Sequence, residues 1–306
     1  MISIQNLSKS FGDLLAVDHL TLEVKAGEIL GFLGPNGAGK TTTIHMLCGV
    51  LDRDSGEILW NGEKSLDKRA IGFCPQENVF WPRLTCFEQL TFTAQSYGLK
   101  RKQAESRASN LLAKLGLEAK RNTLAAKLSG GMKRRLNVAL ALTHDPDILI
   151  FDEPESGLDP QSRLLVRELI RNLAYKKTII VTSHNMDEIE RLAHRVAIID
   201  NGKLLKLDTV DQLKSSVGEG DLMEISFGQD LKNTSLKDLL VALSNQVDSV
   251  AVVQNRIQIR SKEVAEKIPE IIKMISAADL EIEDIQIRKN SLEDVFIKLT
   301  GKGLRE

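Results

Sequence analysis

Short apolar runs alternate with segments of helical pattern along the first two thirds of the chain. Buried strands are predicted where β-branched and other apolar residues follow one another, at 29–33, 148–151, 178–182 and 196–199. Such strands, separated by helices, are typical of a parallel sheet covered on both faces. The opening differs, because polar and apolar residues alternate over 2–7 and 20–24, which predicts antiparallel strands.

Two further regions depart from this pattern. Residues 84–143 contain no convincing buried strand, and their apolar residues recur at helical spacing, so we expect a helical insertion inside an α/β core. Around 214–220, small residues and glycines mark a linker. We therefore expect a first domain over 1–218 and a second over 219–306.

The second domain has its own order of predicted elements. Strand, helix, strand, strand, helix and strand are expected at 222–227, 235–243, 247–253, 256–260, 263–276 and 281–288, with a turn at Gln254 and Asn255. That order, βαββαβ, is the pattern of ferredoxin-like α+β domains. A last helix is predicted to begin at Ser291, because Asp294 stands where a variant capping box has its carboxylate.

Composition narrows the class of protein. The chain has 306 residues, 42% hydrophobic and 27% charged, as ordinary globular proteins do. No stretch free of Asp, Glu, Lys and Arg exceeds 11 residues, whereas a membrane span needs about 20 mostly apolar residues, and the first residues do not resemble a secretory signal. Three cysteines without CxxC spacing favour reduced thiols over a disulfide framework or a zinc site. These features predict a cytoplasmic protein.

One segment is strongly basic although the net charge of the chain is −1. Residues 98–135 carry eleven basic and two acidic residues. A basic patch can bind nucleic acid or an anionic membrane surface. The interspersed Ala, Leu and Ser favour a solvated helical face instead.

A phosphate-binding motif follows the first buried strand. The pattern GxxxxGKT is fulfilled by Gly34-Pro35-Asn36-Gly37-Ala38-Gly39-Lys40-Thr41, and a helix is expected over 42–48. Glycines allow positive φ, so successive backbone N–H groups turn towards phosphate oxygens, and the helix N-terminus adds positive potential. Lys40 is predicted to reach the β- and γ-phosphates of ATP, and the Thr41 hydroxyl to bind Mg²⁺.

Two carboxylates stand at the end of another buried strand. The run 148–151 ends at Asp152 and Glu153, so both belong to the carboxyl edge of the sheet. Asp152 is predicted to hold Mg²⁺ or its water, and Glu153 to polarise an attacking water. The alternative for Glu153 is an ordinary surface residue after a strand.

Six short motifs, in one order over residues 11–184, resemble those of the ATP-binding subunits of ABC transporters. They are Phe11-Gly12 (aromatic loop), Cys74-Pro75-Gln76-Glu77 (glutamine loop), Leu128-Ser129-Gly130-Gly131-Met132 (signature), Asp152-Glu153-Pro154 (second magnesium motif), Ser156-Gly157-Leu158-Asp159 (aspartate loop) and Ser183-His184 (histidine switch). The ending 291–296 resembles the C-terminal extensions of exporter-type members. The resemblance implies a P-loop NTPase core with a mixed sheet, an antiparallel β subdomain and the helical insertion, next to the small α+β domain.

The resemblance also implies the site residues. Two subunits would pair head to tail as a homodimer, with Asp159 at their interface, and ATP on one would be closed by the other's Ser129, Gly130 and Gly131. Hydrolysis would use Glu153, His184 and Gln76, and Mg²⁺ would be held by Thr41, Gln76 and Asp152. ATP itself would contact Phe11, Val17, Asn36, Gly37, Ala38, Gly39, Lys40, Thr41 and Thr42.

Two residues depart from the family's usual pattern. Met132 replaces a Gln, which removes one polar contact near the nucleotide. Glu155 stands where a neutral residue is usual, and it either raises the pKa of Glu153 or faces solvent. We expect it to face solvent, because Glu is seldom fully buried.

The sequence thus predicts an ATPase that powers a separate, integral membrane permease, an exporter, from the inner face of the cell membrane. The family contacts its permease through the segment 77–100, where Phe80 and Trp81 fit such a groove and core packing equally well. One alternative is a soluble ABC-type ATPase that acts on ribosomes or nucleic acid. It is disfavoured because such relatives usually carry two cassettes or a long coiled coil. A regulatory module without turnover is disfavoured by the intact site residues.

Overall fold

The computed structural model describes residues 1–64, 67–218, 220–228, 235–253, 255–262, 264–278 and 280–301. It divides into two compact units between Val210 and Asp211, and each is treated by itself below. The predicted residues Glu219, Gln254 and Glu263 lie outside the described part. The limits predicted for the domains, 1–218 and 219–306, stay a prediction.

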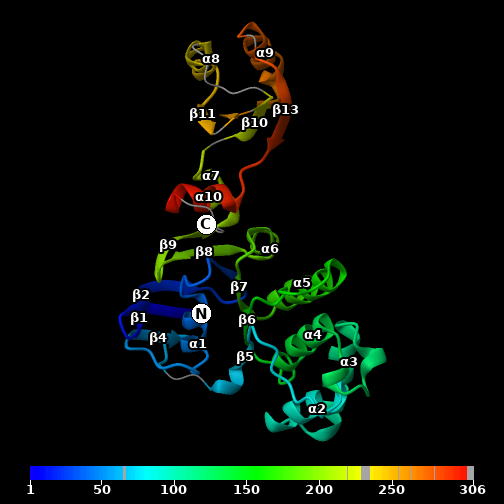
Figure 1. Cartoon of the computed structure of the whole chain (residues 1–306). Coiled ribbons are helices and arrows are strands. Elements are labelled where there is room, and N and C mark those ends of the chain that lie inside the picture. The colour runs from blue at the N-terminus through cyan, green and yellow to red at the C-terminus, as the bar shows by residue number, and fades with distance from the viewer. Residues whose placement is uncertain are drawn as a thin grey trace. The chain divides into compact units, whose positions relative to one another are not determined.

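A six-stranded sheet forms the centre of the first unit (Figure 1). Its strand order is β5-β6-β7-β3-β8-β9, and all neighbours are parallel except β8 and β9. The strands are β3 (Ile29–Leu33), β5 (Ile71–Cys74), β6 (Ile148–Asp152), β7 (Thr178–Ser183), β8 (Arg195–Asp200) and β9 (Lys203–Thr209). The four predicted buried strands are confirmed.

A separate three-stranded antiparallel sheet lies beside it, in the order β2-β1-β4. It consists of β1 (Ile2–Phe11), β2 (Leu14–Val24) and β4 (Ser55–Trp60). The antiparallel opening is confirmed, whereas β4 and the four-residue β5 were missed because their apolar runs are short. Apolar residues of both sheets and of α1 (Lys40–Leu47) share one core. Gly56 is needed where β4 meets β1, since it has a φ of 85° and a Cβ there would lie 2.3 Å from the Asn6 carbonyl oxygen.

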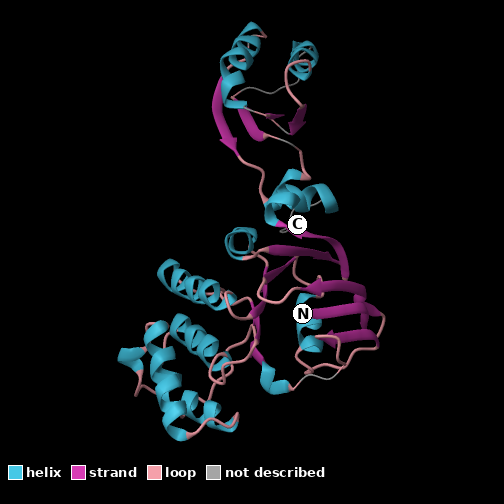
Figure 2. Ribbon diagram, turned by 180° about the vertical axis from the view of Figure 1, so that it is seen from behind, coloured by secondary structure: helices cyan, strands magenta, loops and turns pink. Residues whose placement is uncertain are grey.

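The predicted insertion is helical apart from its connections and one isolated β-bridge between Thr85 and Leu124, and residues 84–143 are all described. The segment comprises α2 (Cys86–Ser96), α3 (Arg101–Lys114), α4 (Gly130–Ala141) and two short 3₁₀ turns (Glu118–Lys120 and Ala125–Lys127). A capping box of Thr85 and Glu88 begins α2. The front and rear views agree that these helices and the antiparallel sheet lie on opposite sides of the six-stranded sheet (Figures 1 and 2). Two more helices, α5 (Pro160–Ala174) and α6 (Met186–Leu192), follow β6 and β7.

The second unit contains the predicted ferredoxin-like pattern. Its four strands form a fully antiparallel sheet in the order β11-β12-β10-β13. Its elements are α7 (Val210–Ser215), β10 (Asp221–Phe227), α8 (Ser235–Ser244), β11 (Ser249–Val253), β12 (Arg256–Ser261), α9 (Val264–Ala277), β13 (Ile282–Arg288) and α10 (Leu292–Thr300). Apolar side chains of the sheet, α8 and α9 form its core. Ser291 and Asp294 form the expected capping box of α10.

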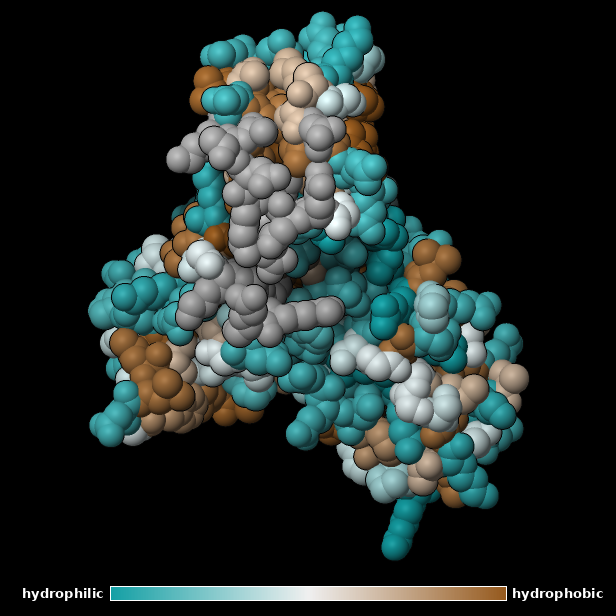
Figure 3. Space-filling view, turned by 45° about the horizontal axis from the view of Figure 1, so that its top comes forward, coloured by the Kyte–Doolittle hydropathy of each residue, from teal (hydrophilic) through white to brown (hydrophobic). Residues whose placement is uncertain are grey.

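Among the described residues, each helix is either too short or too polar to span a lipid bilayer. On the face drawn in Figure 3, hydrophobic side chains occur as separate patches between hydrophilic ones.

Candidate functional site

Four neighbouring parallel strands deliver the candidate site to one edge of the sheet. The strands β5, β6, β7 and β3 are adjacent in that order. Gln76 follows β5, Asp152 ends β6 and Glu153 comes directly after it, His184 follows β7, and the phosphate loop follows β3. Because parallel strands present their carboxyl ends at the same edge, residues far apart in the sequence meet there.

The phosphate loop has the strained backbone that its glycines were expected to allow. Gly37 and Gly39 have φ values of 83° and 97°. A Cβ on Gly39 would lie 2.3 Å from the Ala16 carbonyl oxygen, and one on Gly34 would lie 2.2 Å from that of Ile199. Glycine is therefore required for close approach at both places. The helix α1 begins at Lys40, two residues before the predicted start.

The side chain of Lys40 is held inside this loop. Its Nζ donates to the carbonyl oxygens of Gly34 (2.7 Å) and Pro35 (2.9 Å), and the residue is buried. Burial lowers the pKa of the Lys40 ammonium, while the carboxylates of Glu153 and Asp152 act in the opposite sense. A polyanion brought against this loop would stabilise the buried charge, which is the chemistry of a nucleotide phosphate site.

The other predicted ATP contacts surround the loop at different depths. Phe11 is 49% exposed, as a ring that stacks on a base must be, whereas Val17 is fully buried beside Gly39 and lies in the core. Asn36 and Gly37 are exposed, Ala38 is buried, and Thr41 and Thr42 are half-buried.

Asp152 has the free oxygen that a cation site needs. One carboxylate oxygen accepts from the Thr182 hydroxyl, and the other is buried without a hydrogen-bond partner. A buried, unpaired carboxylate oxygen is costly unless a ligand uses it. A carboxylate and a threonine hydroxyl are the hard oxygen ligands that Mg²⁺ prefers, so Asp152 and Thr41 fit that ion.

Glu153 lies between the two other predicted hydrolytic side chains. Its Oε2 accepts from Gln76 Nε2 at 3.3 Å, and its Oε1 lies 2.8 Å from His184 Nδ1. Its side chain is 7% exposed, so the alternative of an ordinary surface residue is wrong. Its φ of 49° is rare for a residue other than Gly, Asn or Asp, and its N–H donates to Thr182 Oγ1 at 3.0 Å. Strained backbone of this kind is common where side chains are held for chemistry.

Glu155 does not face solvent, and that expectation was wrong. The residue is 1% exposed, and its carboxylate accepts from Arg167 Nε (3.0 Å) and Nη2 (2.5 Å). Arg167 lies in α5, twelve residues further along the chain, and its positive charge compensates for the burial of the Glu155 carboxylate. Glu188 lies nearby, accepts from the Ser183 hydroxyl at 2.8 Å, and has its pKa raised by burial and by the Glu155 carboxylate.

Glu155→Ala should destabilise the protein by about 3 kcal/mol, because it leaves the Arg167 guanidinium largely buried without its carboxylate. Urea unfolding followed by circular dichroism measures this change. The double variant Glu155→Thr/Arg167→Leu should recover most of the loss, since it removes both charges. As a control, Glu105→Ala breaks the exposed pair with Arg101 and should move the midpoint little. A stable Glu155→Ala would contradict the importance of the pair.

The signature residues begin a helix and are accessible. Ser129 is the N-cap of α4 and accepts from the Met132 N–H at 3.3 Å, so the helix starts at Gly130. Ser129 and Gly130 are exposed. Asp159 is likewise exposed and caps α5, accepting from the Ser162 N–H at 3.0 Å and from its hydroxyl at 2.6 Å. Both helix N-termini therefore offer positive potential at the surface.

Three site-supporting residues were not predicted. Thr182 supports Asp152 and Glu153, and Asn137 and Arg134 hold the glutamine loop. The pattern gave little signal for them. Arg134 stands in a basic run that reads as a solvated face, yet it is 2% exposed.

A glycine loop that caps a helix after β3, with a carboxylate that has an unpaired oxygen two strands away in the sheet, is typical of P-loop NTPases. Comparison with known proteins gives the family. Residues 17–156 match the ABC transporter family, and residues 209–300 match the C-terminal domain of DrrA1-3-like ATP-binding proteins. The chain belongs to the ATP-binding subunits of ABC transporters, and it is an ATPase.

Relatives and solved structures agree over long stretches. The linearmycin resistance ATP-binding protein LnrL of Bacillus subtilis is 35% identical and covers 100% of both chains. The Nod factor export ATP-binding protein I of Paraburkholderia xenovorans is 38% identical over 100% of this chain and 98% of its own. A solved ATP-binding subunit of an ABC transporter is 29% identical, with a TM-score of 0.65 over 71% of this chain and 92% of its own. A dimeric bacterial ABC transporter cassette is 26% identical, with a TM-score of 0.64 over 68% and 98%.

Proposed function

We propose that this ATPase powers export through a separate membrane permease, which would hold it at the inner face of the cell membrane. The proposal rests mainly on Glu153, which lies between Gln76 and His184. Gln76 belongs to the glutamine loop, and the chain after that loop lines an exposed groove that includes Phe80 and Trp81. The two relatives named for export and for resistance, which match the whole chain, support the direction of transport.

In this proposal the phosphate loop binds ATP and Glu153 activates water. Lys40 would exchange its loop carbonyls for the β- and γ-phosphates, and Phe11 would stack on the base. Mg²⁺, held by Thr41, Asp152 and Gln76, would neutralise charge on the phosphates. Glu153 would orient and polarise the water, and His184 would contact the γ-phosphate.

The ATP would be shared between two copies of the chain. The backbone N–H groups at the start of α4 form a site that can bind an anion, and Ser129 and Gly130 are exposed there. In a head-to-tail dimer they would meet the γ-phosphate on the partner subunit's loop, with Asp159 near the interface. Loss of that phosphate would then open the dimer.

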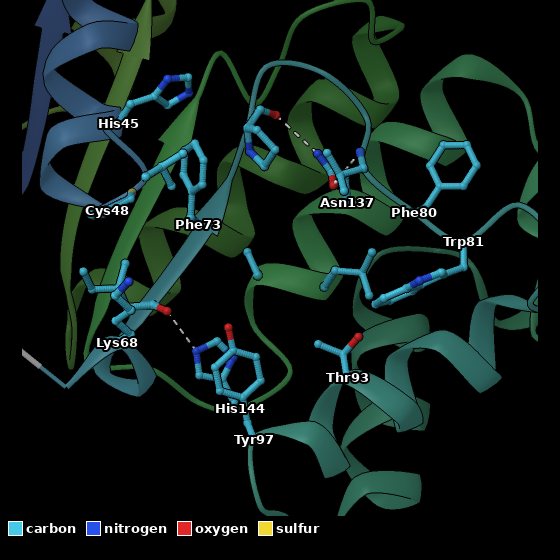
Figure 4. Close-up of a pocket in the computed structure, with 17 residues that line it drawn as sticks. His45, Cys48, Lys68, Phe73, Phe80, Trp81, Thr93, Tyr97, Asn137 and His144 are labelled. Atoms are coloured by element: carbon cyan, nitrogen blue, oxygen red, sulfur yellow. Dashed lines mark hydrogen bonds between the residues drawn. The ribbon is translucent and has the colours of Figure 1, made fainter. Parts of the chain in front are cut away.

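The groove that we assign to the permease is lined in part by Phe80 and Trp81, which follow the glutamine loop (Figure 4). Asn137 links the two, because its amide donates to the carbonyl oxygens of Pro75 and Glu77 and its Oδ1 accepts from the Val79 N–H. Trp81 is 46% exposed and meets Phe92 edge-on at 5.4 Å. Apolar and aromatic side chains dominate the wall, which includes Phe73, Val79, Phe80, Trp81, Tyr97, Leu140 and His144. Such a wall fits an amphipathic helix of a partner.

Trp81→Glu should release the protein from membranes that carry its permease and leave basal ATPase activity within about twofold, because the groove lies outside the phosphate site. Co-purification with the integral partner, made from the neighbouring genes, measures the first effect. Tyr175→Glu is the matched control, since it changes an aromatic side chain that is 88% exposed and lies outside the groove. Membrane binding that survives Trp81→Glu and fails in Tyr175→Glu would place the permease elsewhere.

The ribosome or nucleic-acid alternative gains no support from the basic segment. Arg134 is buried, the Arg121 guanidinium lies 3.4 Å from the Phe87 ring, and Arg135 donates to the Leu115 carbonyl oxygen. These three charges thus contact groups of their own chain and are not free to line a phosphate-binding surface.

A further inference from the structure

The guanidinium of Arg134 makes an unusual set of contacts. Arg134 lies in α4, five residues after the exposed Ser129, and only 2% of it is exposed. An arginine has five N–H donors. Five backbone carbonyl oxygens accept from this guanidinium at 2.5–3.3 Å, those of Pro75, Gln76, Asp152, Glu153 and Pro154.

These carbonyls belong to two segments that carry hydrolytic side chains. Nη1 bonds the loop after β5, at Pro75 and Gln76. Nη2 and Nε bond the turn after β6, which includes Glu153 in its left-handed conformation. Among the described residues, no carboxylate forms an ion pair with Arg134, so its buried charge is satisfied by carbonyl dipoles alone. Moving either segment would therefore leave the charge underpaired.

We infer that Arg134 is a positioning residue for hydrolysis, which fixes the Gln76 and Glu153 backbones in one arrangement and ties both to the signature helix. The inference rests on the proposed roles of Glu153 and Gln76. Hydrolysis requires the carboxylate within hydrogen-bond reach of the water, and a shift of about 1 Å in such a group can cost a hundredfold in rate.

In a dimer, the N-terminus of α4 would meet the ATP on the partner subunit. Arg134, in the same helix, holds the turn that carries Glu153 of its own subunit. Closure of the dimer around one ATP would thus affect the position of the Glu153 that serves the other ATP. The coupling runs through one rigid helix, of which Ser129 is the N-cap.

The neighbouring Arg135 provides a matched control. It is also a signature-helix arginine bonded to carbonyls, since Nη1 donates to Leu115 at 2.7 Å and to Gly116 at 3.3 Å. Those acceptors lie in the helical insertion after α3, away from the site. Arg135→Met therefore removes a similar group without touching either hydrolytic segment.

The test compares Arg134→Met, Arg134→Lys and Arg135→Met in the full chain by ATP titration and steady-state turnover. Arg134→Met should leave ATP affinity within about threefold, because no contact reaches the phosphate loop, and lower kcat by about a hundredfold. Lys has three donors and no fork, so Arg134→Lys should fold and still lose most of kcat. Arg135→Met should keep kcat within about twofold.

A double-variant cycle separates positioning from mere packing. If Arg134 acts through Glu153, then Arg134→Met should add little further loss to Glu153→Gln. The inference is overturned if both Arg134 variants keep kcat, if both lose folding or ATP affinity in step with kcat, or if the losses multiply. Full turnover of Glu153→Gln alone would instead refute the proposed role of Glu153, whatever Arg134 does.

Discussion

Glu153→Gln should bind ATP with little change in affinity and hydrolyse it about 10²–10⁴ times more slowly than the wild type, the range that a positioned general base contributes. Gln keeps the shape of the side chain and can still hydrogen bond with Gln76 and His184, which lie 3.3 and 2.8 Å from the carboxylate. It cannot accept a proton from water. Single-turnover hydrolysis of labelled ATP measures the loss directly, and gel filtration should show an ATP-bound dimer that accumulates.

The matched control for this change is Glu77→Gln, which removes the same charge from an exposed position in the glutamine loop. It should retain turnover within about twofold, as surface changes usually do. If Glu153→Gln keeps turnover within a few-fold of the wild type, the base lies elsewhere, and His184 becomes the next residue to test.

Lys40→Ala should weaken ATP binding by about ten- to a hundredfold, because charge-assisted hydrogen bonds to the phosphates are worth about 1.5–3 kcal/mol. This is a net range, because Lys40 Nζ gives up its hydrogen bonds to the Gly34 and Pro35 carbonyl oxygens when it turns to the phosphates. Isothermal titration calorimetry with ATP measures the affinity.

Lys64→Ala serves as the control for Lys40→Ala, since it removes one charge from an exposed lysine paired with Glu57 on the antiparallel sheet. Its ATP affinity should equal that of the wild type. Unchanged affinity in Lys40→Ala would refute the assignment of the phosphate loop.

The sequence predicted the central sheet best where the composition of a run is typical of a buried strand. The run 29–33 is apolar and the run 178–182 consists of β-branched residues, as is typical of strands buried on both faces. In contrast, β4 contains Ser55, Gly56 and Glu57 and is shaped by its close approach to β1. The pairing of β4 with β1 depends on residues that are distant in the sequence, so no local sequence pattern predicts it.

The same distinction holds at the site. Lys40 and Asp152 belong to motifs whose spacing encodes their chemistry. Glu155 and Arg134 have polar side chains that composition places at the surface, and each is buried because a partner distant in sequence accepts or supplies the matching group. A prediction of exposure from each charged residue alone therefore fails where two buried polar groups pair with each other.

Mixing two defective proteins tests whether one ATP is hydrolysed between two chains. Lys40→Ala damages the phosphate loop. Gly130→Asp places a carboxylate against the phosphate on the partner subunit and leaves the chain's own fold intact, since a Cβ at Gly130 meets no atom within 4 Å. Gly131 suits this test less well, because its Cβ would lie 3.7 Å from the Asp159 carboxylate of its own chain.

Each variant alone should be nearly inactive. In a mixed dimer, the intact loop of the Gly130→Asp chain meets the intact signature of the Lys40→Ala chain, so one complete site forms. ATPase activity measured across mixing ratios, under conditions in which subunits exchange, should therefore rise above that of either variant and peak near an equal mixture. No recovery at any ratio would contradict the shared site.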